Sequence, residues 1–323
     1  MTLTTLDDKV SISTSRDNTS ILTQHSFLSA SSALTCQSKS TRLEKSHLVY
    51  YDHEQGSLEW IEARNKFITA SAIGTILNGP QTAGYRNLLA EKASDGQHRT
   101  FFGSDATRWG HKYEPVADML FEYRNPGVEI YEYGLVHNPN YPYLGVSPDG
   151  ITNKNEMLEI KCPYSRKIDG KIKNEYAHQI QQQLLVCEHE ICNFLECKFV
   201  EVAKTHFWNI FSASTREKGV IIQSLEEGER FNYYSPIELG HNQTDLQDWY
   251  NYRLEDIEAA GGTVVKETYW LLDQYNCQKV KRDPTWYQRY RSNIEKFWLD
   301  VENTRREGWE HLVKKKTVEC LMP

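Results

Sequence analysis

Three charged side chains lie within one short apolar stretch, "GVSPDGITNKNEMLEIKCP" (145–163). Glu159 and Lys161 are two residues apart in the run "MLEIK", and residues two apart on a strand project from the same face. The polar run "TNKNE" predicts a turn that folds this strand against a partner strand ending at Asp149. The pattern therefore brings two carboxylates and an ammonium group to one edge of a hairpin.

These groups are the ones that metal-assisted hydrolysis of a phosphodiester requires. Carboxylate oxygens hold Mg²⁺, which neutralises the negative charge that develops on the phosphate and lowers the pKa of an attacking water. An ammonium group beside the ion stabilises the same charge. A solvated surface ion pair beside a turn is the alternative interpretation. However, Glu159 lies within an apolar strand, where an unpaired carboxylate is costly.

Four blocks of the sequence, taken in order, resemble the PD-(D/E)xK nuclease core. More narrowly, they resemble the phage lambda exonuclease family, also called YqaJ-like viral recombinases. The blocks are "EQGSLEWIEARNKFITAS" (54–71), "WGHKYEPVADMLFE" (109–122), "SPDG" with "LEIKCP" (147–163), and "YAHQIQQQLLV" (176–186). The resemblance implies an α/β fold with a central mixed β-sheet flanked by helices. Additional C-terminal helices are expected, as in the versions that large DNA viruses encode.

The resemblance, carried over residue by residue, implies a metal site and a phosphate pocket. The implied metal ligands are Glu114, Asp149, Glu159 and the backbone carbonyl of Ile160. Lys161 would assist the attacking water, and Gln179 would touch that water or the scissile phosphate. The implied contacts to the 5′-phosphate and the DNA are Arg64, Ser71, Ser147 and either Arg166 or Lys167. Strict spacing from Lys161 favours Lys167, whereas a slip of one residue favours Arg166.

The implied activity is that of a Mg²⁺-dependent exonuclease, with Mn²⁺ as a substitute, that degrades the 5′ strand of double-stranded DNA ends. Degradation from 5′ to 3′ would leave 3′ single strands for recombination or repair, with a single-strand annealing protein as a possible partner. A PD-(D/E)xK endonuclease and a non-catalytic DNA-end-binding relative are the alternatives, although the complete catalytic set speaks against the second. The length of the chain leaves open whether it forms the ring-shaped trimer of the phage enzyme or stays a monomer.

The rest of the sequence indicates how the domain is organised. Residues 1–46 are rich in Ser and Thr and predict a flexible tail, and residues 47–323 predict a single domain. The nuclease core is expected over about 53–211 and a C-terminal extension over about 212–323. Helical spacing indicates helices near 58–67, 72–78, 105–125, 175–187, 246–260 and 284–298. Strand patterns occur near 128–137, 143–150, 157–163, 192–202 and 263–283.

Two of the expected helices carry apolar faces. Leu58, Trp60, Ile61, Arg64 and Phe67 are spaced as one side of the first helix. In the last helix, the apolar face of Trp286, Tyr290, Ile294, Phe297 and Trp298 predicts packing against the domain rather than stacking on bases.

Composition and charge narrow the class of protein further. The formal net charge of −7 argues against coating nucleic acid through bulk positive charge, but allows a local basic groove. Seven scattered cysteines predict free, mostly buried thiols, and the spacing of Cys187, His189, Cys192 and Cys197 does not suit a zinc site. No signal peptide or membrane span is evident, so we expect an intracellular, soluble protein, in the host cytoplasm or nucleus if it is viral.

Overall fold

The computed structural model of the chain describes residues 44–53, 55–98 and 103–313. All of these residues fall within one compact unit. Nearly all of the predicted tail at 1–46 lies outside the described residues, so that part of the domain organisation stays a prediction. No helix in the described ranges is both long and apolar enough to cross a membrane.

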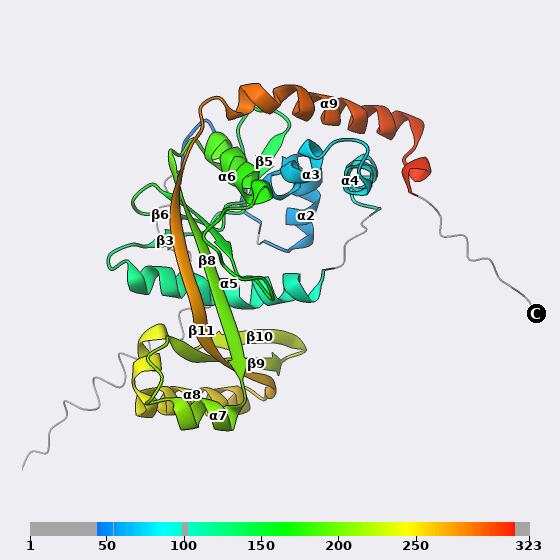
Figure 1. Cartoon of the computed structure of the whole chain (residues 1–323). Coiled ribbons are helices and arrows are strands. Elements are labelled where there is room, and N and C mark those ends of the chain that lie inside the picture. Colours follow the sequence, from blue (N-terminus) through cyan, green and yellow to red (C-terminus); the bar gives the residue numbers. More distant parts are fainter. Residues whose placement is uncertain (1–43, 54, 99–102, 314–323) are drawn as a thin grey trace, which may run out of the picture. The chain divides into compact units, whose positions relative to one another are not determined.

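A seven-stranded mixed sheet forms the centre of the fold, in the order β10-β9-β11-β8-β7-β6-β3. Its strands are β3 (Ile130–Tyr131), β6 (Gly150–Thr152), β7 (Met157–Lys161), β8 (Ile191–Val202), β9 (Lys218–Glu226), β10 (Glu229–Tyr234) and β11 (Thr263–Lys281). Only β7 and β8 pair in parallel, while the other neighbours are antiparallel. The predicted α/β fold with a central mixed sheet flanked by helices is confirmed (Figure 1).

A smaller sheet has the order β1-β4-β5-β2. Its strands are β1 (Val49–Tyr51), β2 (Ile68–Thr69), β4 (Leu135–His137) and β5 (Leu144–Val146). The helices are α2 (Leu58–Asn65), α3 (Ile73–Leu77), α4 (Ala83–Ala93), α5 (Asp105–Arg124), α6 (Asn174–Cys187), α7 (Lys204–Ile210), α8 (Gln243–Ala259) and α9 (Trp286–Glu307). Short 3₁₀ turns lie at Ala70–Ala72 (η2), Ile237–His241 (η3) and Glu310–Leu312 (η4).

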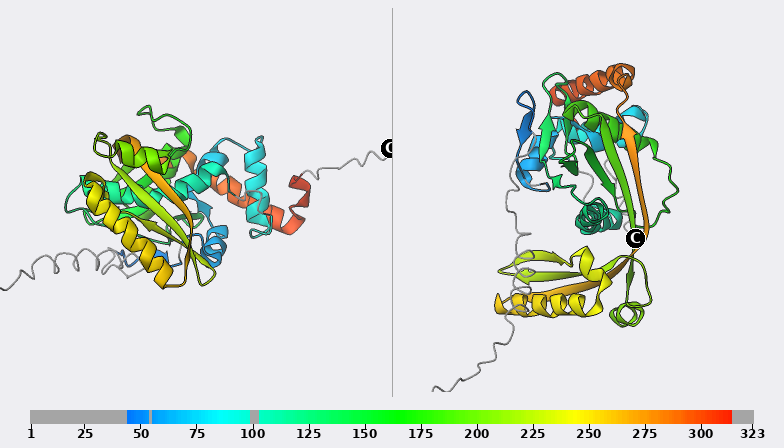
Figure 2. Two further views of the ribbon diagram at one scale, coloured as in Figure 1. Left: turned by 90° about the horizontal axis from the view of Figure 1, so that it is seen from below. Right: turned by 90° about the vertical axis from the view of Figure 1, so that its left-hand side faces the viewer.

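The alternating side chains of β7 divide the core into two layers. Met157 packs with Ile180 of α6 on one face of the sheet. Leu158 and Ile160 pack with Val116 of α5 on the other face. The two helices therefore cover opposite faces of the same strands (Figure 2). The predicted alternation, with Leu158 and Ile160 opposite Glu159 and Lys161, is confirmed.

The prediction that one strand runs over 143–150 and ends at Asp149 is wrong. β5 ends at Val146 and pairs in the small sheet, whereas β6 begins at Gly150 and pairs with β7 in the large sheet. Pro148 lies between them, and proline has no N–H to donate to a continuous ladder. Asp149 therefore precedes its strand, at the point where the chain passes from one sheet to the other.

The predicted apolar face of the first helix is also wrong in part. Leu58 is 74% exposed, and Phe67 lies beyond the end of α2. The last helix packs as predicted, since Trp286, Ile294 and Phe297 are buried in the same core as Ile180. Figure 1 shows α9 crossing beside α6, α3 and α4.

The five described cysteines are free, and four of them are buried, with Cys277 exposed. Cys192 and Cys197 belong to different core layers. They therefore face opposite sides of β8, as their odd separation predicts.

The long strand β11 joins the two halves of the large sheet, because it pairs with β8 over residues 269–281 and with β9 over residues 263–271. Its Trp270 is 1% exposed and meets Phe199 of β8 edge to face, with ring centroids 5.4 Å apart. Its ring also lies so close to Gly219 of β9 that a Cβ there would be 2.7 Å from it. Trp270 thus fixes the junction of three strands.

We predict that Trp270→Ala lowers the free energy of unfolding by about 3–5 kcal/mol, the usual cost of removing a large buried aromatic side chain. Urea denaturation followed by circular dichroism measures this loss. Leu299→Ala is the matched control, since Leu299 is 54% exposed on α9 and its removal should cost no more than about 0.5 kcal/mol. Equal losses in both variants would contradict the role of Trp270.

Candidate active site

Glu159 is the most deeply placed carboxylate of the site. β7 holds it on the face that α6 covers, and its side chain is 0% exposed. Lys161 and Gln179 both donate to its Oε1, the amide of Gln179 at 2.6 Å. Gln183 Nε2 donates to its Oε2 at 2.7 Å. Both oxygens of this buried acid are therefore hydrogen-bonded within the protein.

Asp149 lies beside Glu159, although it comes from the segment between the two sheets. Its Oδ2 accepts a hydrogen bond from the backbone N–H of Ile160 at 2.6 Å. Burial raises the pKa of the Asp149 carboxyl well above its ordinary value, and the negative charges of Glu159 and Glu114 raise it further. The structure thus concentrates acidic groups at this point.

Glu114 enters the site from α5, on the other face of the sheet. Burial raises its pKa, Lys161 opposes this effect, and Glu159 adds to it. Burial lowers the pKa of Lys161, but Glu159 and Asp149 outweigh burial and the net pKa is raised. Lys161 is therefore the cation that the three predicted acids share. The structure brings together Glu114, Asp149, Glu159, Lys161 and Gln179.

The donor set suits a hard divalent cation, because three carboxylates share one cationic side chain and a buried acid is left with a raised pKa. The arrangement as it stands is not a closed cage, since no three acidic, His or Cys side chains in the described residues are placed to hold one ion. Glu159 instead binds hydrogen-bond donors. The assignment of Glu114, Asp149, Glu159 and the Ile160 carbonyl as metal ligands stays a prediction.

Arg64, Ser71 and Ser147 lie together at the end of α2, joined by Trp60. The Arg64 guanidinium packs over the Trp60 ring, 4.1 Å from its centroid, and donates to Ser71 Oγ at 3.2 Å. Trp60 Nε1 donates to Ser147 Oγ at 3.2 Å. Ser57 caps the start of the helix by accepting from the N–H of Trp60. Ser147 is two residues before Asp149, so this cluster adjoins the acids.

Arg166 and Lys167 differ in their surroundings. Arg166 Nη2 donates to Glu196 Oε1 at 2.5 Å, and Glu196 is 1% exposed on β8. The guanidinium also lies 5.7 Å from the centre of the Tyr176 ring. Lys167 is exposed. Arg166 is thus engaged by a buried acid, and which of the two residues contacts DNA stays a prediction.

Sequence patterns did not indicate two residues of the site, Trp60 and Gln183. Gln183 follows Gln179 by four residues, so both amides lie on the same face of α6 and reach the two oxygens of Glu159. Trp60 precedes Arg64 by four residues on α2 in the same way. The i, i+4 spacing of a polar or aromatic residue with a predicted site residue was the available signal.

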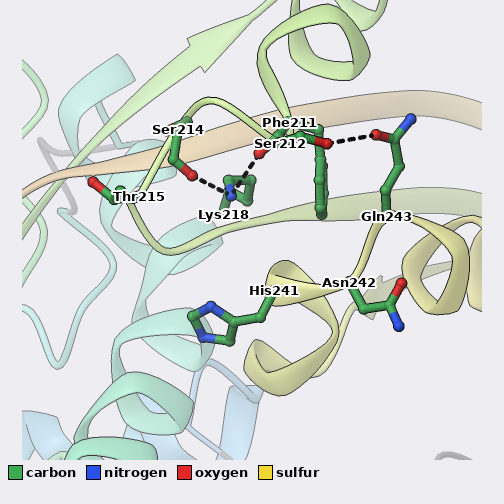
Figure 3. A pocket seen from close by; sticks show the side chains of 8 residues that line it. All are labelled: Phe211, Ser212, Ser214, Thr215, Lys218, His241, Asn242 and Gln243. Carbon is green, nitrogen blue, oxygen red and sulfur yellow. Dashed lines mark hydrogen bonds between the residues drawn. The ribbon is translucent and has the colours of Figure 1, made fainter.

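A hollow of about 480 Å³ lies elsewhere, between the end of α7, the start of β9 and the start of α8 (Figure 3). Lys218 lines it, but its ammonium group donates to the carbonyls of Phe211, Ser214 and Gly240. These three bonds use all three of its N–H donors. The lysine therefore holds the surrounding loops together.

Comparison with known proteins gives a family match for part of the chain. Residues 59–190 match the family model of the YqaJ-like viral recombinase domain. The matched range contains all of the predicted site residues, from Arg64 to Gln179. The family resemblance that the four sequence blocks indicate is therefore confirmed for this part of the chain.

The chain is also similar to an uncharacterized protein, R354, of Acanthamoeba polyphaga mimivirus, at 28% identity over 288 residues. The match covers 76% of this chain and 52% of R354, so the chain spans about half the length of this curated relative.

Among solved structures, the chain is similar to the alkaline exonuclease LHK-Exo of Laribacter hongkongensis, with 20% identity and a TM-score of 0.49. That match covers 78% of this chain and 95% of LHK-Exo. A phage-related exonuclease of Haemophilus somnus 129PT matches with 13% identity and a TM-score of 0.42, covering 75% of this chain and 96% of that one.

We predict that Asp149→Asn stabilises the protein in EDTA at pH 8. A carboxyl whose pKa is raised by folding stabilises the fold only while it holds its proton, so this contribution is lost as the pH rises through the folded pKa. The amide removes this loss and keeps the acceptor for the Ile160 N–H. We expect a Tm increase of at least about 2 °C, corresponding to about 1 kcal/mol, that shrinks towards pH 4.

The control is Asp105→Asn, which changes an exposed acid on the first turn of α5. Removing that charge should leave the Tm unchanged or slightly lower, because an acid at a helix start stabilises by about 0.3–1 kcal/mol. If the Tm of Asp149→Asn at pH 8 is no higher than that of the unaltered protein, the ionised Asp149 carboxylate does not destabilise the fold and the prediction is wrong.

Proposed function

We propose that the chain is a Mg²⁺-dependent exonuclease that degrades the 5′ strand of double-stranded DNA ends, from 5′ to 3′, and leaves 3′ single strands for recombination or repair. The names of LHK-Exo and of the Haemophilus somnus protein describe exonucleases, and the matching family model describes a viral recombinase. A single-strand annealing protein that binds the product strand is part of the same proposal.

The observation that carries this proposal is the buried cluster around Glu159. An acid that is 0% exposed is expensive to keep, and here Lys161, Gln179 and Gln183 all contact it while Asp149 lies beside it. A purely structural core would place an apolar side chain at this position of β7 at lower cost. The arrangement of acids with one shared lysine is what phosphodiester hydrolysis requires.

Glu114, Asp149, Glu159 and the carbonyl of Ile160 would hold Mg²⁺, which would supply charge neutralisation at the phosphate and a water of lowered pKa. The residues of the chain then have separate tasks. Lys161, as a charged ammonium group, stabilises the negative charge of the transition state. The Gln179 amide orients the attacking water or a phosphate oxygen. Gln183 keeps the other edge of Glu159 fixed.

The end of α2 supplies the recognition of the strand end. A guanidinium forms charge-assisted hydrogen bonds to a phosphate, and two serine hydroxyls add neutral donors. Arg64 and Ser71 are already hydrogen-bonded to each other, and Trp60 holds Ser147 next to them. A terminal phosphate bound by Ser147 would lie close to Asp149, two residues further along the chain. Cleavage would then fall within the first nucleotides of the strand.

We predict that Lys161→Ala and Glu159→Gln reduce the initial rate of duplex digestion about 100- to 1,000-fold, the usual cost of removing one group that stabilises the transition state. The release of acid-soluble nucleotides in Mg²⁺ measures the rate. Lys279→Ala is the matched control, because Lys279 forms an exposed ion pair with Glu156 on the same sheet. Full digestion by either site variant, with circular dichroism showing it folded, would refute the assignment.

We predict that the unaltered protein degrades a duplex with 5′-phosphates faster than one with 5′-hydroxyls, and that Arg64→Ala reduces this ratio about tenfold. The loss corresponds to about 1.4 kcal/mol, as expected for a charge-assisted hydrogen bond. Strands labelled separately at their 5′ and 3′ ends report the polarity in the same reaction. Equal rates on the phosphorylated and the hydroxyl duplex would favour an endonuclease. Loss of the 3′ label before the 5′ label would show that the strand is degraded from 3′ to 5′.

A further inference from the structure

The carbonyl end of α2, which carries Arg64, is held by a lysine from another helix. Lys92 of α4 is 3% exposed, and its Nζ donates to the backbone carbonyl of Arg64 at 2.8 Å. One residue further, Asn65 Nδ2 donates to the carbonyl of Asp95 at 3.2 Å. The end of α4 is therefore hydrogen-bonded to the end of α2 at two consecutive residues, Arg64 and Asn65.

The C-terminal helix α9 in turn holds the end of α4. Arg305 Nη2 donates to the carbonyl of Lys92 at 3.1 Å and to Asp95 Oδ1 at 2.8 Å. Five residues earlier on α9, Asp300 accepts from the hydroxyl of Tyr85 at 2.9 Å, and Phe297 meets the same ring edge to face. A continuous series of contacts thus runs from α9 through α4 to Arg64.

Burying Lys92 is costly, and packing alone does not explain it. Burial lowers the pKa of Lys92 to about 7, and the nearby charges of Arg64 and Arg305 lower it in the same direction. A leucine or methionine would fill the space without this cost. In either protonation state the amine nitrogen donates a hydrogen bond, and here it donates to the backbone carbonyl of Arg64. The lysine therefore serves the backbone position of that residue.

The position of that backbone decides where the Arg64 guanidinium lies. The guanidinium is held 3.2 Å from Ser71 Oγ and 4.1 Å from the centre of the Trp60 ring, contacts that a shift of about 1 Å would disrupt. Misplacing a recognition group by this distance therefore forfeits most of what the group contributes to the rate.

We propose that Lys92 and Arg305 are positioning residues that fix Arg64 for recognition of a 5′-terminal phosphate. This inference rests on the proposed function and extends it, since it makes the C-terminal helix part of the apparatus that recognises the strand end. Neither residue touches the DNA. Both act through the end of α2.

The test uses the full chain with Lys92→Met, which keeps an unbranched side chain of similar length, and Arg305→Gln. The first measurement is kcat/KM on duplexes with a 5′-phosphate and with a 5′-hydroxyl. We expect the ratio to fall about tenfold in both variants through a higher KM on the phosphorylated duplex, with digestion of the hydroxyl duplex unchanged. The second measurement is hydrogen exchange of residues 58–66, which should quicken in both variants.

Arg291→Gln is the matched control. Arg291 also lies on α9, but it pairs with Glu295 on the same helix at 2.6 Å in an exposed position. Its variant should keep both the phosphate preference and the exchange rates of the unaltered protein. The hydrogen-exchange rate of residues 105–124 in α5 shows whether a variant has lost stability in the whole domain rather than only at the end of α2.

The outcomes separate this inference from the proposed function. If the unaltered protein shows no preference for the 5′-phosphate, the proposed recognition of the strand end fails and this inference fails with it. If the unaltered protein has the preference and Lys92→Met keeps it in full, the inference alone is overturned. Faster exchange in α5 as well as in 58–66 would assign Lys92 to general stability and would also overturn it.

Discussion

The burial of the Glu159 carboxylate is the constraint on which the rest of the site depends. A charged group without solvent must be paired, and the partners come from β7 itself and from α6. The parallel pairing of β7 with β8 requires a crossover, and α6 is that crossover. The same helix uses Gln182 to hold the carbonyl of Ile68 at 2.8 Å, beside the strand that leads to Ser71. One helix thus links the acids around Glu159 to the cluster of Arg64, Ser71 and Ser147.

The sequence predicted the parts of the site that follow from short-range geometry. Glu159 and Lys161 share a face because successive side chains of β7 point to opposite faces of the sheet. Gln179 was placed on a helix because the apolar residues around it recur at helical spacing. Helix ends at Pro126-Gly127 and Gly261-Gly262 were readable for the same local reason, since these residues do not continue a helix. The β9–β10 hairpin was not predicted. Its turn is formed by Glu227 and Gly228, which both have positive φ, and the glycine was the sequence signal of a tight turn.

The remaining features depend on contacts between distant segments, which local patterns do not encode. Pro148 interrupts what reads as one strand, but only the pairing of β5 and β6 in different sheets shows where the chain crosses. Lys92 stands in an ordinary helical sequence, and its burial arises from the packing of α9 on α4, more than 200 residues later in the chain. The sequence indicated Arg166 as a basic residue that could contact DNA, but it did not indicate the ion pair of Arg166 with the buried Glu196.

The position of β11 has a consequence for how the protein is made. β8 lies between β7 and β11, so its 12 residues have an unpaired edge until residues 263–281 have left the ribosome. An open edge of this length is a template for pairing with another chain. All of the predicted site residues are synthesised before that edge is covered. The nascent chain is therefore open to aggregation through this edge during the whole interval between synthesis of β8 and synthesis of β11.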